Sequence, residues 1–330
     1  MKFLITGGAG FIGSHLAEKL LDRGDDVIAL DDLSSGSLEN LEHLLPREGF
    51  DFVAGSAADT RVVRELVEEC DTIIHLAAAV GVRLILERPV HTIENNLYAA
   101  GIVLAAAADA VAAGKSRLVL LASTSEVYGK NSRPPFREDD DLTLGPTINS
   151  RWAYACSKAM DEWLGFAYHR EKGVPVIIAR FFNTVGPRQT GRYGMVLPNF
   201  AEQALAGAPI TVFGNGSQSR CFCHVDDTVE AVLRLLGNPS AVGQVFNVGS
   251  DREISMNDVA LMIRGAVGSD SPIELVPYDE AYPEGGFEDM QRRVPDSGKL
   301  EKFTGFRPMI TLEQIVADVV ADRRQHMAPP

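Results

Sequence analysis

A glycine-rich turn close to the first residue constrains this chain more than any other feature. Gly7-Gly8-Ala9-Gly10-Phe11-Ile12-Gly13 follows an apolar run at residues 3–5 and opens a stretch with helical apolar spacing. A strand, a tight glycine turn and a helix let backbone amides approach a pyrophosphate, whose charge is stabilised at the helix N-terminus. The contacts expected for a dinucleotide are Gly7, Gly10, Phe11, Ile12 and Gly13.

An acidic residue at the end of the next apolar run makes this interpretation more specific. Residues 27–30 are apolar and lead into Asp31, 18 positions after Gly13. A carboxylate there accepts hydrogen bonds from the adenosine ribose hydroxyls and repels a 2′-phosphate. The simpler alternative is a glycine-rich turn followed by a surface aspartate. The strand, the helix and the acid at this spacing favour binding of NAD over NADP.

Composition excludes several classes of partner. The net charge of −14 disfavours nonspecific binding to nucleic acid or to an anionic membrane surface. It does not disfavour an anionic substrate that is held by a few local arginines. The apolar window at residues 99–113 is shorter than a bilayer span and contains Asp109. We therefore expect neither a nucleic acid nor a membrane as partner.

The cysteines indicate a reducing compartment. Their spacing is typical neither of a disulfide framework nor of a metal site, so no metal is expected; they are Cys70, Cys156, Cys221 and Cys223. Because residue 3 already belongs to a predicted strand, no signal peptide is expected. The expected location is the cytoplasm.

Apolar runs and helical patterns alternate through the first half of the chain. Strands are expected at 2–6, 26–31, 51–54, 72–76, 117–123 and 175–180, and helices near 11–22, 60–68, 91–113 and 153–171. This alternation predicts an α/β fold: a doubly wound parallel sheet (Rossmann) with helices on both faces. Residues 1–182 are expected to form the NAD-binding domain. Residues 183–330, rich in Gly, Pro and Arg loops, would mainly form a smaller, irregular substrate lobe, with later segments returning to the first domain.

Two positions of the predicted helix at 153–171 suggest acid–base chemistry. Tyr154 and Lys158 are four residues apart and project from one helix face. An ammonium favours the phenolate form of a neighbouring phenol, so Tyr154 could remove a hydroxyl proton as hydride leaves for NAD. Lys158 could also hold the nicotinamide ribose. A Tyr–Lys pair at this spacing is common by chance, and its weight comes from following a dinucleotide motif.

A second polar segment follows the predicted strand at 117–123. Ser123-Thr124-Ser125-Glu126-Val127-Tyr128-Gly129 would bring hydroxyls and a carboxylate to the rim of the cofactor cleft. Thr124 or Ser125 can hydrogen-bond the reacting hydroxyl or ketone. Interconversion of ketone and alcohol needs no further acid, so Glu126 suggests additional proton chemistry: enolisation, elimination or reprotonation after decarboxylation. The plainer alternative is a Ser/Thr turn in which Glu126 pairs with a surface arginine.

Together these motifs resemble the extended short-chain dehydrogenase/reductases, which include nucleotide-sugar epimerases, dehydratases and decarboxylases. The resemblance covers nearly the whole chain and rests on the glycine motif, Asp31, His75-Leu76-Ala77-Ala78, the 123–129 segment and Tyr154-x-x-x-Lys158. It implies NAD as cofactor, with Leu76, Ala77, Ala78 and Asn96 as further contacts. It also implies a homodimer formed through the helices at 91–113 and 153–171.

The subfamily signals are most similar to those of UDP-glucuronate decarboxylases. The Ser-Glu pair at 125–126 resembles these enzymes but also GDP-mannose 4,6-dehydratases. Arg151, three residues before Tyr154, and the segments 182–188 and 214–220 resemble UDP-xylose synthases. Two departures matter. No acidic residue lies between Tyr154 and Lys158, which weakens the decarboxylase assignment. Ser56 occupies a position near the adenine where the family usually has aspartate, which would loosen cofactor binding.

For the substrate, the resemblance points to the second lobe. Arg220 and Arg293 are expected to bind the diphosphate, since arginine forks match phosphate oxygens. Asn183 would reach the same diphosphate, and Phe213 would pack near the base. Arg188 and Arg192 are expected to be ordinary surface charges.

These residues favour a UDP-glucuronate decarboxylase that forms UDP-xylose through a 4-keto intermediate. Tyr154 would act as base at the C4 hydroxyl, and Glu126 or Arg151 would govern reprotonation at C5. The alternatives are an NDP-hexose 4-epimerase acting on UDP-glucose or UDP-glucuronate, and then an NDP-sugar 4,6-dehydratase. A catalytically silent NAD-binding protein is the alternative outside the enzymes.

Overall fold

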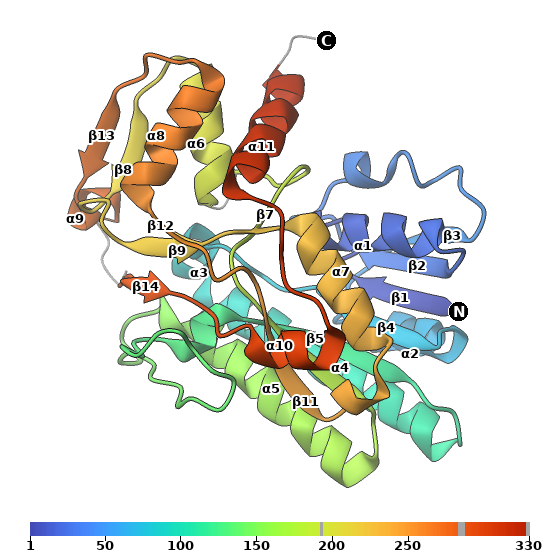
Figure 1. Cartoon of the computed structure of the whole chain (residues 1–330). Coiled ribbons are helices and arrows are strands. Elements are labelled where there is room, and N and C mark those ends of the chain that lie inside the picture. Colours follow the sequence, from blue (N-terminus) through green and yellow to red (C-terminus); the bar gives the residue numbers. More distant parts are fainter. Residues whose placement is uncertain (192–193, 283–287, 328–330) are drawn as a thin grey trace.

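A seven-stranded parallel sheet forms the centre of the molecule (Figure 1). The computed structural model describes residues 1–191, 194–282 and 288–327, and only the backbone of residues 82–84. The sheet has the strand order β11-β6-β5-β4-β1-β2-β3. Its strands are β1 Lys2–Thr6, β2 Asp26–Asp31, β3 Phe50–Ala54, β4 Thr72–His75, β5 Leu118–Thr124, β6 Val176–Phe181 and β11 Gln244–Val248. The order reverses between β1 and β4, where such sheets open a crevice beyond their carboxyl ends.

Helices cover both faces of this sheet, which confirms the predicted doubly wound fold. One face carries α1 Phe11–Asp22, α7 Val225–Leu236 and α10 Gly298–Thr304; the other carries α2 Thr60–Glu69, α4 Pro89–Ala112 and α5 Trp152–Lys172. The short helix α3 Val82–Glu87 lies against α4. Short 3₁₀ turns lie at η1 Leu38–Leu41, η2 Ser125–Tyr128 and η3 Pro239–Ala241. The six strands predicted from the sequence agree with the structure to within one residue at each end.

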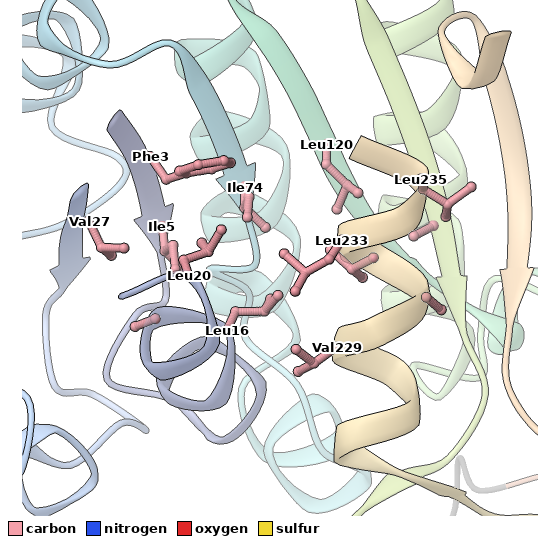
Figure 2. Close-up of a cluster of buried hydrophobic side chains, with 14 of the residues drawn as sticks. Phe3, Ile5, Leu16, Leu20, Val27, Ile74, Leu120, Val229, Leu233 and Leu235 are labelled. Carbon is pink, nitrogen blue, oxygen red and sulfur yellow. The ribbon is translucent and has the colours of Figure 1, made fainter. Parts of the chain in front are cut away.

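The core between the sheet and its first helical layer explains why the chain alternates as it does. Leu16 and Leu20 of α1 and Leu233 of α7 point toward Ile5 and Ile74 of the sheet (Figure 2). Strands of a parallel sheet that is covered on both faces must be apolar along their length, as these are. The side chains of the core hold the strand ends in register, and the functional loops follow from those ends.

Helix α4 is longer than its apolar window suggested. It has 24 residues, so by length and composition alone it could cross a membrane, and the expectation of a segment too short to do so was wrong. Its apolar character has a local cause, because Ala99, Val103 and Ala107 are buried between the sheet, α2 and α5.

The second lobe has its own small core and short strands. Leu197, Val259, Ile263, Ile315 and Val319 lie in this core. The lobe contains α6 Val196–Leu205, α8 Met256–Val267, α9 Tyr278–Ala281, α11 Leu312–Met327, β7 Thr184–Val185, β8 Ile210–Phe213, β9 Ser219–Cys221, β10 Cys223–His224, β12 Glu253–Ser255, β13 Ile273–Val276 and β14 Arg292–Arg293. Between its segments the chain returns to the main sheet through α7, β11 and α10. The sequence did not reveal β11, the strand that pairs with β6 and ends the sheet.

Candidate active site

The glycine turn after β1 forms a close-packed cradle at the N-terminus of α1. A Cβ on Gly7, whose φ is +74°, would lie 2.8 Å from the backbone nitrogen of Ala77, and one on Gly13 would lie 2.2 Å from the carbonyl oxygen of Gly7. Glycine is therefore required at both positions. Helix α1 begins at Phe11, and its N-cap, Gly10, supplies no side-chain hydrogen bond. The first amides of α1 are thus left for a phosphate, and this geometry fits a dinucleotide.

Asp31 lies at the end of β2, beside this cradle. Its carboxylate accepts hydrogen bonds from the backbone amides of Ala9, at 3.0 Å, and Leu33, at 2.8 Å. Burial raises the pKa of Asp31, while the backbone hydrogen bonds from Leu33 and Ala9 oppose the shift. These bonds orient the carboxylate and leave acceptor capacity for the ribose hydroxyls of a bound cofactor.

The loop after β4 borders the same crevice. Leu76, Ala77 and Ala78 are half-buried there, and the amide of Ala77 donates to the Thr6 hydroxyl at 3.3 Å. Asn96 is fully buried: its Oδ1 accepts from the amide of Ala79 at 2.8 Å, and its Nδ2 donates to Ser157 at 3.2 Å. Asn96 therefore joins the loop after β4 to helix α5, a positioning role that its sequence position did not reveal.

The hydroxyl segment turns sharply at the end of β5 into η2. The Thr124 hydroxyl accepts a hydrogen bond from the amide of Glu126 at 3.2 Å and also hydrogen-bonds the Tyr154 phenol. Thr124, Ser125 and Glu126 are all buried. The structure thus brings Tyr154 from α5 against Thr124 at the carboxyl edge of the sheet.

Glu126 is held by two arginines from distant segments. Its carboxylate accepts hydrogen bonds from Arg151, at the start of α5, and from Nη1 of Arg293 at 3.3 Å. Burial alone would favour the protonated form, but the charges of Arg151 and Arg293 outweigh it and lower the pKa of Glu126. Glu126 therefore does not pair with a surface arginine, since Arg151 is 2% exposed.

Both arginines keep an unused donor in this buried cluster. Within the part of the chain that the structure describes, Nε of Arg151 and Nε of Arg293 are buried without a hydrogen-bond partner. A buried donor without a partner is costly, and an anionic group of a ligand would satisfy it. The cluster is thus suited to an anion beside Glu126.

The Tyr–Lys pair differs from the expected arrangement in one respect. The Lys158 ammonium hydrogen-bonds Asp161 at 3.0 Å, and both side chains are 2% exposed. Burial raises the pKa of Tyr154, Glu126 and Asp161 raise it further, and the Thr124 hydrogen bond opposes them. Asp161 therefore binds the Lys158 ammonium that was expected to favour the Tyr154 phenolate. The sequence predicted no role for Asp161, although its i,i+3 spacing from Lys158 indicated that the two side chains could meet.

The two arginines expected at the diphosphate lie side by side. Arg293 of β14 pairs with Arg220 of β9 in the small sheet of the second lobe. Burial lowers the pKa of Arg293 to about 10, and the neighbouring Arg220 charge adds to the shift. Arg220 is bound to Asp289 at 2.5 Å, and Asp289 also accepts from the Tyr278 hydroxyl. Nothing in the sequence marked Asp289 as a partner.

The remaining substrate residues lie around these strands. Asn183 donates from Nδ2 to the carbonyl of Cys221 at 2.9 Å, next to Arg220 in the chain. Phe213 is partly exposed and contacts Tyr282 edge to face at 5.7 Å. Arg188 forms an ion pair with Glu18 of α1. Arg192 lies outside the described residues.

A buried network supports the catalytic segment from behind. Arg180 of β6 binds both carboxylate oxygens of Glu162, at 2.8 and 2.7 Å, and Glu162 also accepts from Ser123 at 2.5 Å. Arg180 further donates to the Tyr128 hydroxyl at 2.8 Å. These contacts fix η2 and α5 relative to each other, which keeps Thr124 and Tyr154 together.

Comparisons with known proteins agree with this geometry. The family profile described as GDP-mannose 4,6-dehydratase matches residues 4–319. The chain is 41% identical over 320 residues to a UDP-N-acetyl-alpha-D-glucosaminuronate decarboxylase of Bacillus cytotoxicus, covering 97% of this chain and 96% of the relative. It is 35% identical to UDP-glucuronic acid decarboxylase 1 of Arabidopsis thaliana, covering 99% of this chain and 71% of that protein.

Solved structures with a similar fold include enzymes that are named for a different activity, 4-epimerisation. A UDP-glucuronic acid 4-epimerase of Bacillus cereus, in complex with UDP-glucuronic acid and NAD, superposes with a TM-score of 0.88 at 25% identity, over 99% of this chain and 100% of that one. A UDP-glucose 4-epimerase of Thermotoga maritima with UDP-glucose gives 0.87 at 27% identity, over 99% and 100%. The chain therefore belongs to the GDP-mannose 4,6-dehydratase family of extended short-chain dehydrogenase/reductases, as its motifs predicted.

Proposed function

We propose that this protein is an NAD-dependent decarboxylase of a UDP-hexuronate, with UDP-glucuronate as substrate and UDP-xylose as product. The observation that carries this proposal is Glu126, buried between Arg151 and Arg293 and next to the Thr124–Tyr154 pair. The cluster supplies a carboxylate for proton transfer and guanidinium donors for a sugar carboxylate. The decarboxylase relatives support the same activity.

The residues present can perform each step of this reaction. Bound NAD would supply the acceptor for the C4 hydride and later return that hydride. Tyr154 takes the C4 hydroxyl proton while Thr124 orients that oxygen. In the resulting ketone the C5–C6 bond breaks, its electron pair enters an enolate that extends to the C4 oxygen, and carbon dioxide leaves. C5 takes up a proton that comes from solvent, and Glu126, or a guanidinium of Arg151, governs its delivery. Tyr154 returns its proton to the C4 oxygen as C4 is reduced.

The cofactor contacts follow from the cradle. Gly7, Gly10, Phe11, Ile12 and Gly13 would contact the pyrophosphate, and Asp31 the adenosine ribose. Leu76, Ala77 and Ala78 would border the cofactor along the loop after β4, Asn96 would support that loop, and Lys158 would reach the nicotinamide ribose.

The substrate contacts come from the second lobe. Asn183, Arg220 and Arg293 would bind the UDP diphosphate, with Phe213 near the base.

One substrate separates the proposal from its main rival. Purified protein with UDP-glucuronate should release carbon dioxide and form UDP-xylose. Formation of UDP-galacturonate alone would overturn the proposal in favour of a 4-epimerase, the activity named for the B. cereus structure. UDP-N-acetylglucosaminuronate should be tested in the same assay, because the relative that is 41% identical to this chain is named as a decarboxylase of that compound. A 4,6-dehydratase would instead act on a nucleotide hexose.

We also propose a cytoplasmic homodimer. All four cysteines are free, and Cys156 is exposed, which suits a reducing compartment. Helices α4 and α5 pack side by side and expose Ile93, Tyr98, Met160 and Trp163. A hollow of about 490 Å³ beside Tyr98 is lined by Leu97, Gly101, Ile102 and Ala105 of α4 and by residues at α2. The small residues of α4 would allow a second copy to approach closely.

A further inference from the structure

Helix α5 carries two adjacent buried carboxylates with different partners. Glu162 is fully engaged by Arg180 and Ser123, which are structural residues. Asp161 makes its side-chain hydrogen bond, among the described residues, to Lys158, and its other oxygen, Oδ1, is buried without a partner. A buried carboxylate that contacts a functional cation and retains an unused acceptor is unlike an ordinary stabilising ion pair.

The balance of charge at this point depends on Asp161. Lys158 and Asp161 are each 2% exposed, so neither charge is compensated by water. Removal of one member of such a pair leaves an uncompensated buried charge.

The other ionisable groups around this pair come from several elements. Glu126 and Arg151 act on the Tyr154 phenol from η2 and from the start of α5. His75 at the end of β4 lies close enough for the Lys158 charge to lower its pKa, after the larger effect of burial. Glu162 raises the pKa of Asp161, which burial raises most and Lys158 opposes. Of these groups, Asp161 is the one bonded to the Lys158 ammonium.

We propose that Asp161 is a positioning residue: its carboxylate holds the Lys158 ammonium in place within the closed site. One N–H of Lys158 bonds Asp161, and two remain for the nicotinamide ribose and the Tyr154 side. Asp161 also places a negative charge near the phenol, opposite in effect to Lys158. This inference rests on the roles proposed above for Lys158 and Tyr154.

A double-mutant cycle on NAD binding tests the inference without relying on turnover. Calorimetry of cofactor-free protein would compare wild type, Asp161→Asn, Lys158→Met and the double variant at pH values from 6 to 10. Asp161→Asn should weaken NAD binding about tenfold, because loss of a charge-assisted hydrogen bond is worth roughly one factor of ten. In the Lys158→Met background the same substitution should change the affinity less than about twofold.

The pH profile gives a second readout that a merely structural role would not move. In Asp161→Asn the acid limb of the kcat/KM profile should shift to lower pH. The Asp161 carboxylate raises the pKa of the Tyr154 phenol, and its neutral replacement no longer opposes the phenolate. Asp161→Glu, which restores a carboxylate, should return the profile toward wild type. Should Asn impair folding, Asp161→Ala gives the same comparison.

Asp227→Asn is the matched control. Asp227 is a buried carboxylate of α7 that accepts hydrogen bonds from the backbone amides of Met309 and Ile310. Its substitution should lower the thermal unfolding temperature but leave the pH profile and NAD affinity in place.

Two outcomes overturn the inference. The inference is wrong if Asp161→Asn retains the wild-type NAD affinity and pH profile. It is also wrong if the effect of Asp161→Asn on NAD affinity persists at full size in the Lys158→Met background. If Lys158→Met itself leaves NAD binding unchanged, the proposed role of Lys158 fails as well. If Lys158→Met weakens binding and Asp161→Asn does not, only the inference about Asp161 fails.

Discussion

The Glu126 carboxylate lies 3.3 Å from Nη1 of Arg293, although the two residues are 167 positions apart in the chain. One comes from the turn after β5 in the main sheet, and the other from β14 in the second lobe. Arg293 was expected only at the diphosphate. Its contact with Glu126 places it at the proposed proton-transfer group as well, and this changes what its substitution should do.

Arg293→Ala should lower kcat as well as raise KM for the nucleotide sugar. Loss of the guanidinium removes both an anion contact and one of the charges that lower the pKa of Glu126. We expect kcat/KM to fall about 100-fold or more, since each charge-assisted hydrogen bond is worth roughly 1.5–3 kcal/mol. Steady-state kinetics measure both parameters. Arg292→Ala is the control, because Arg292 is more than half exposed and pairs with Glu253; equal effects of the two variants would remove Arg293 from the site.

Tyr154→Phe should nearly abolish turnover while NAD and UDP still bind. The phenyl ring keeps the packing of α5, and only the proton-accepting oxygen that contacts Thr124 is lost. Loss of a general base costs about 10²–10⁴-fold in rate. Tyr168→Phe, on the same helix, serves as control for the substitution itself. A Tyr154→Phe enzyme with near-normal kcat would exclude Tyr154 as the base.

Glu126→Gln should separate the decarboxylase from the epimerase by chemistry. Gln keeps the shape of the side chain but cannot transfer a proton, so the first hydride transfer should survive. In a single turnover, NADH absorbance should appear while product formation slows about 100-fold or more. An epimerase would lose much less, because rotation of a ketone needs no carboxylate. Conversion of substrate at the wild-type rate would make Glu126 structural.

His75 should make folding sensitive to mild acid. Burial, followed by the Lys158 charge, lowers the pKa of His75 to about 3, from 6.5. Between these values the unfolded chain binds a proton that the folded protein does not, so the stability contribution present above pH 6.5 is lost as the pH falls. His75→Gln should therefore flatten the dependence of the unfolding temperature on pH between 7 and 5. The exposed His91 provides the control, His91→Gln, and an equal flattening there would contradict the assignment.

Charge on the outer face of α4 should break the proposed dimer. Tyr98 and Ile93 are exposed on the monomer, and burying an aspartate in an apolar interface is unfavourable. Tyr98→Asp combined with Ile93→Asp should halve the mass measured by light scattering at micromolar concentration. Leu261→Asp, at an exposed position of α8, should leave the mass unchanged. A wild-type protein that already shows the monomer mass would reject the dimer.

Local pattern in the sequence was sufficient for the nucleotide-binding half. The glycine turn, Asp31 and the six predicted strands depend on short-range rules: apolar strands, glycine where a Cβ cannot fit, and an acid at a strand end. Tyr154 and Thr124 could be located on a helix and at a strand end because each position follows from a single element. Strand β11 was missed, since a five-residue strand after an irregular lobe carries little periodic signal.

Tertiary structure alone decided which charges meet. Pairing of β9 with β14 brings Arg220 beside Arg293, and the return of the chain to the sheet brings Arg293 to Glu126. Asp289 binds Arg220 across 69 positions in the same way. Contacts of this kind depend on how segments distant in the sequence pack together, within the second lobe and between that lobe and the main sheet, which no local propensity encodes. The sequence thus determined the fold and the cofactor crevice, and the packing of the lobes determined the electrostatics of the proposed active site.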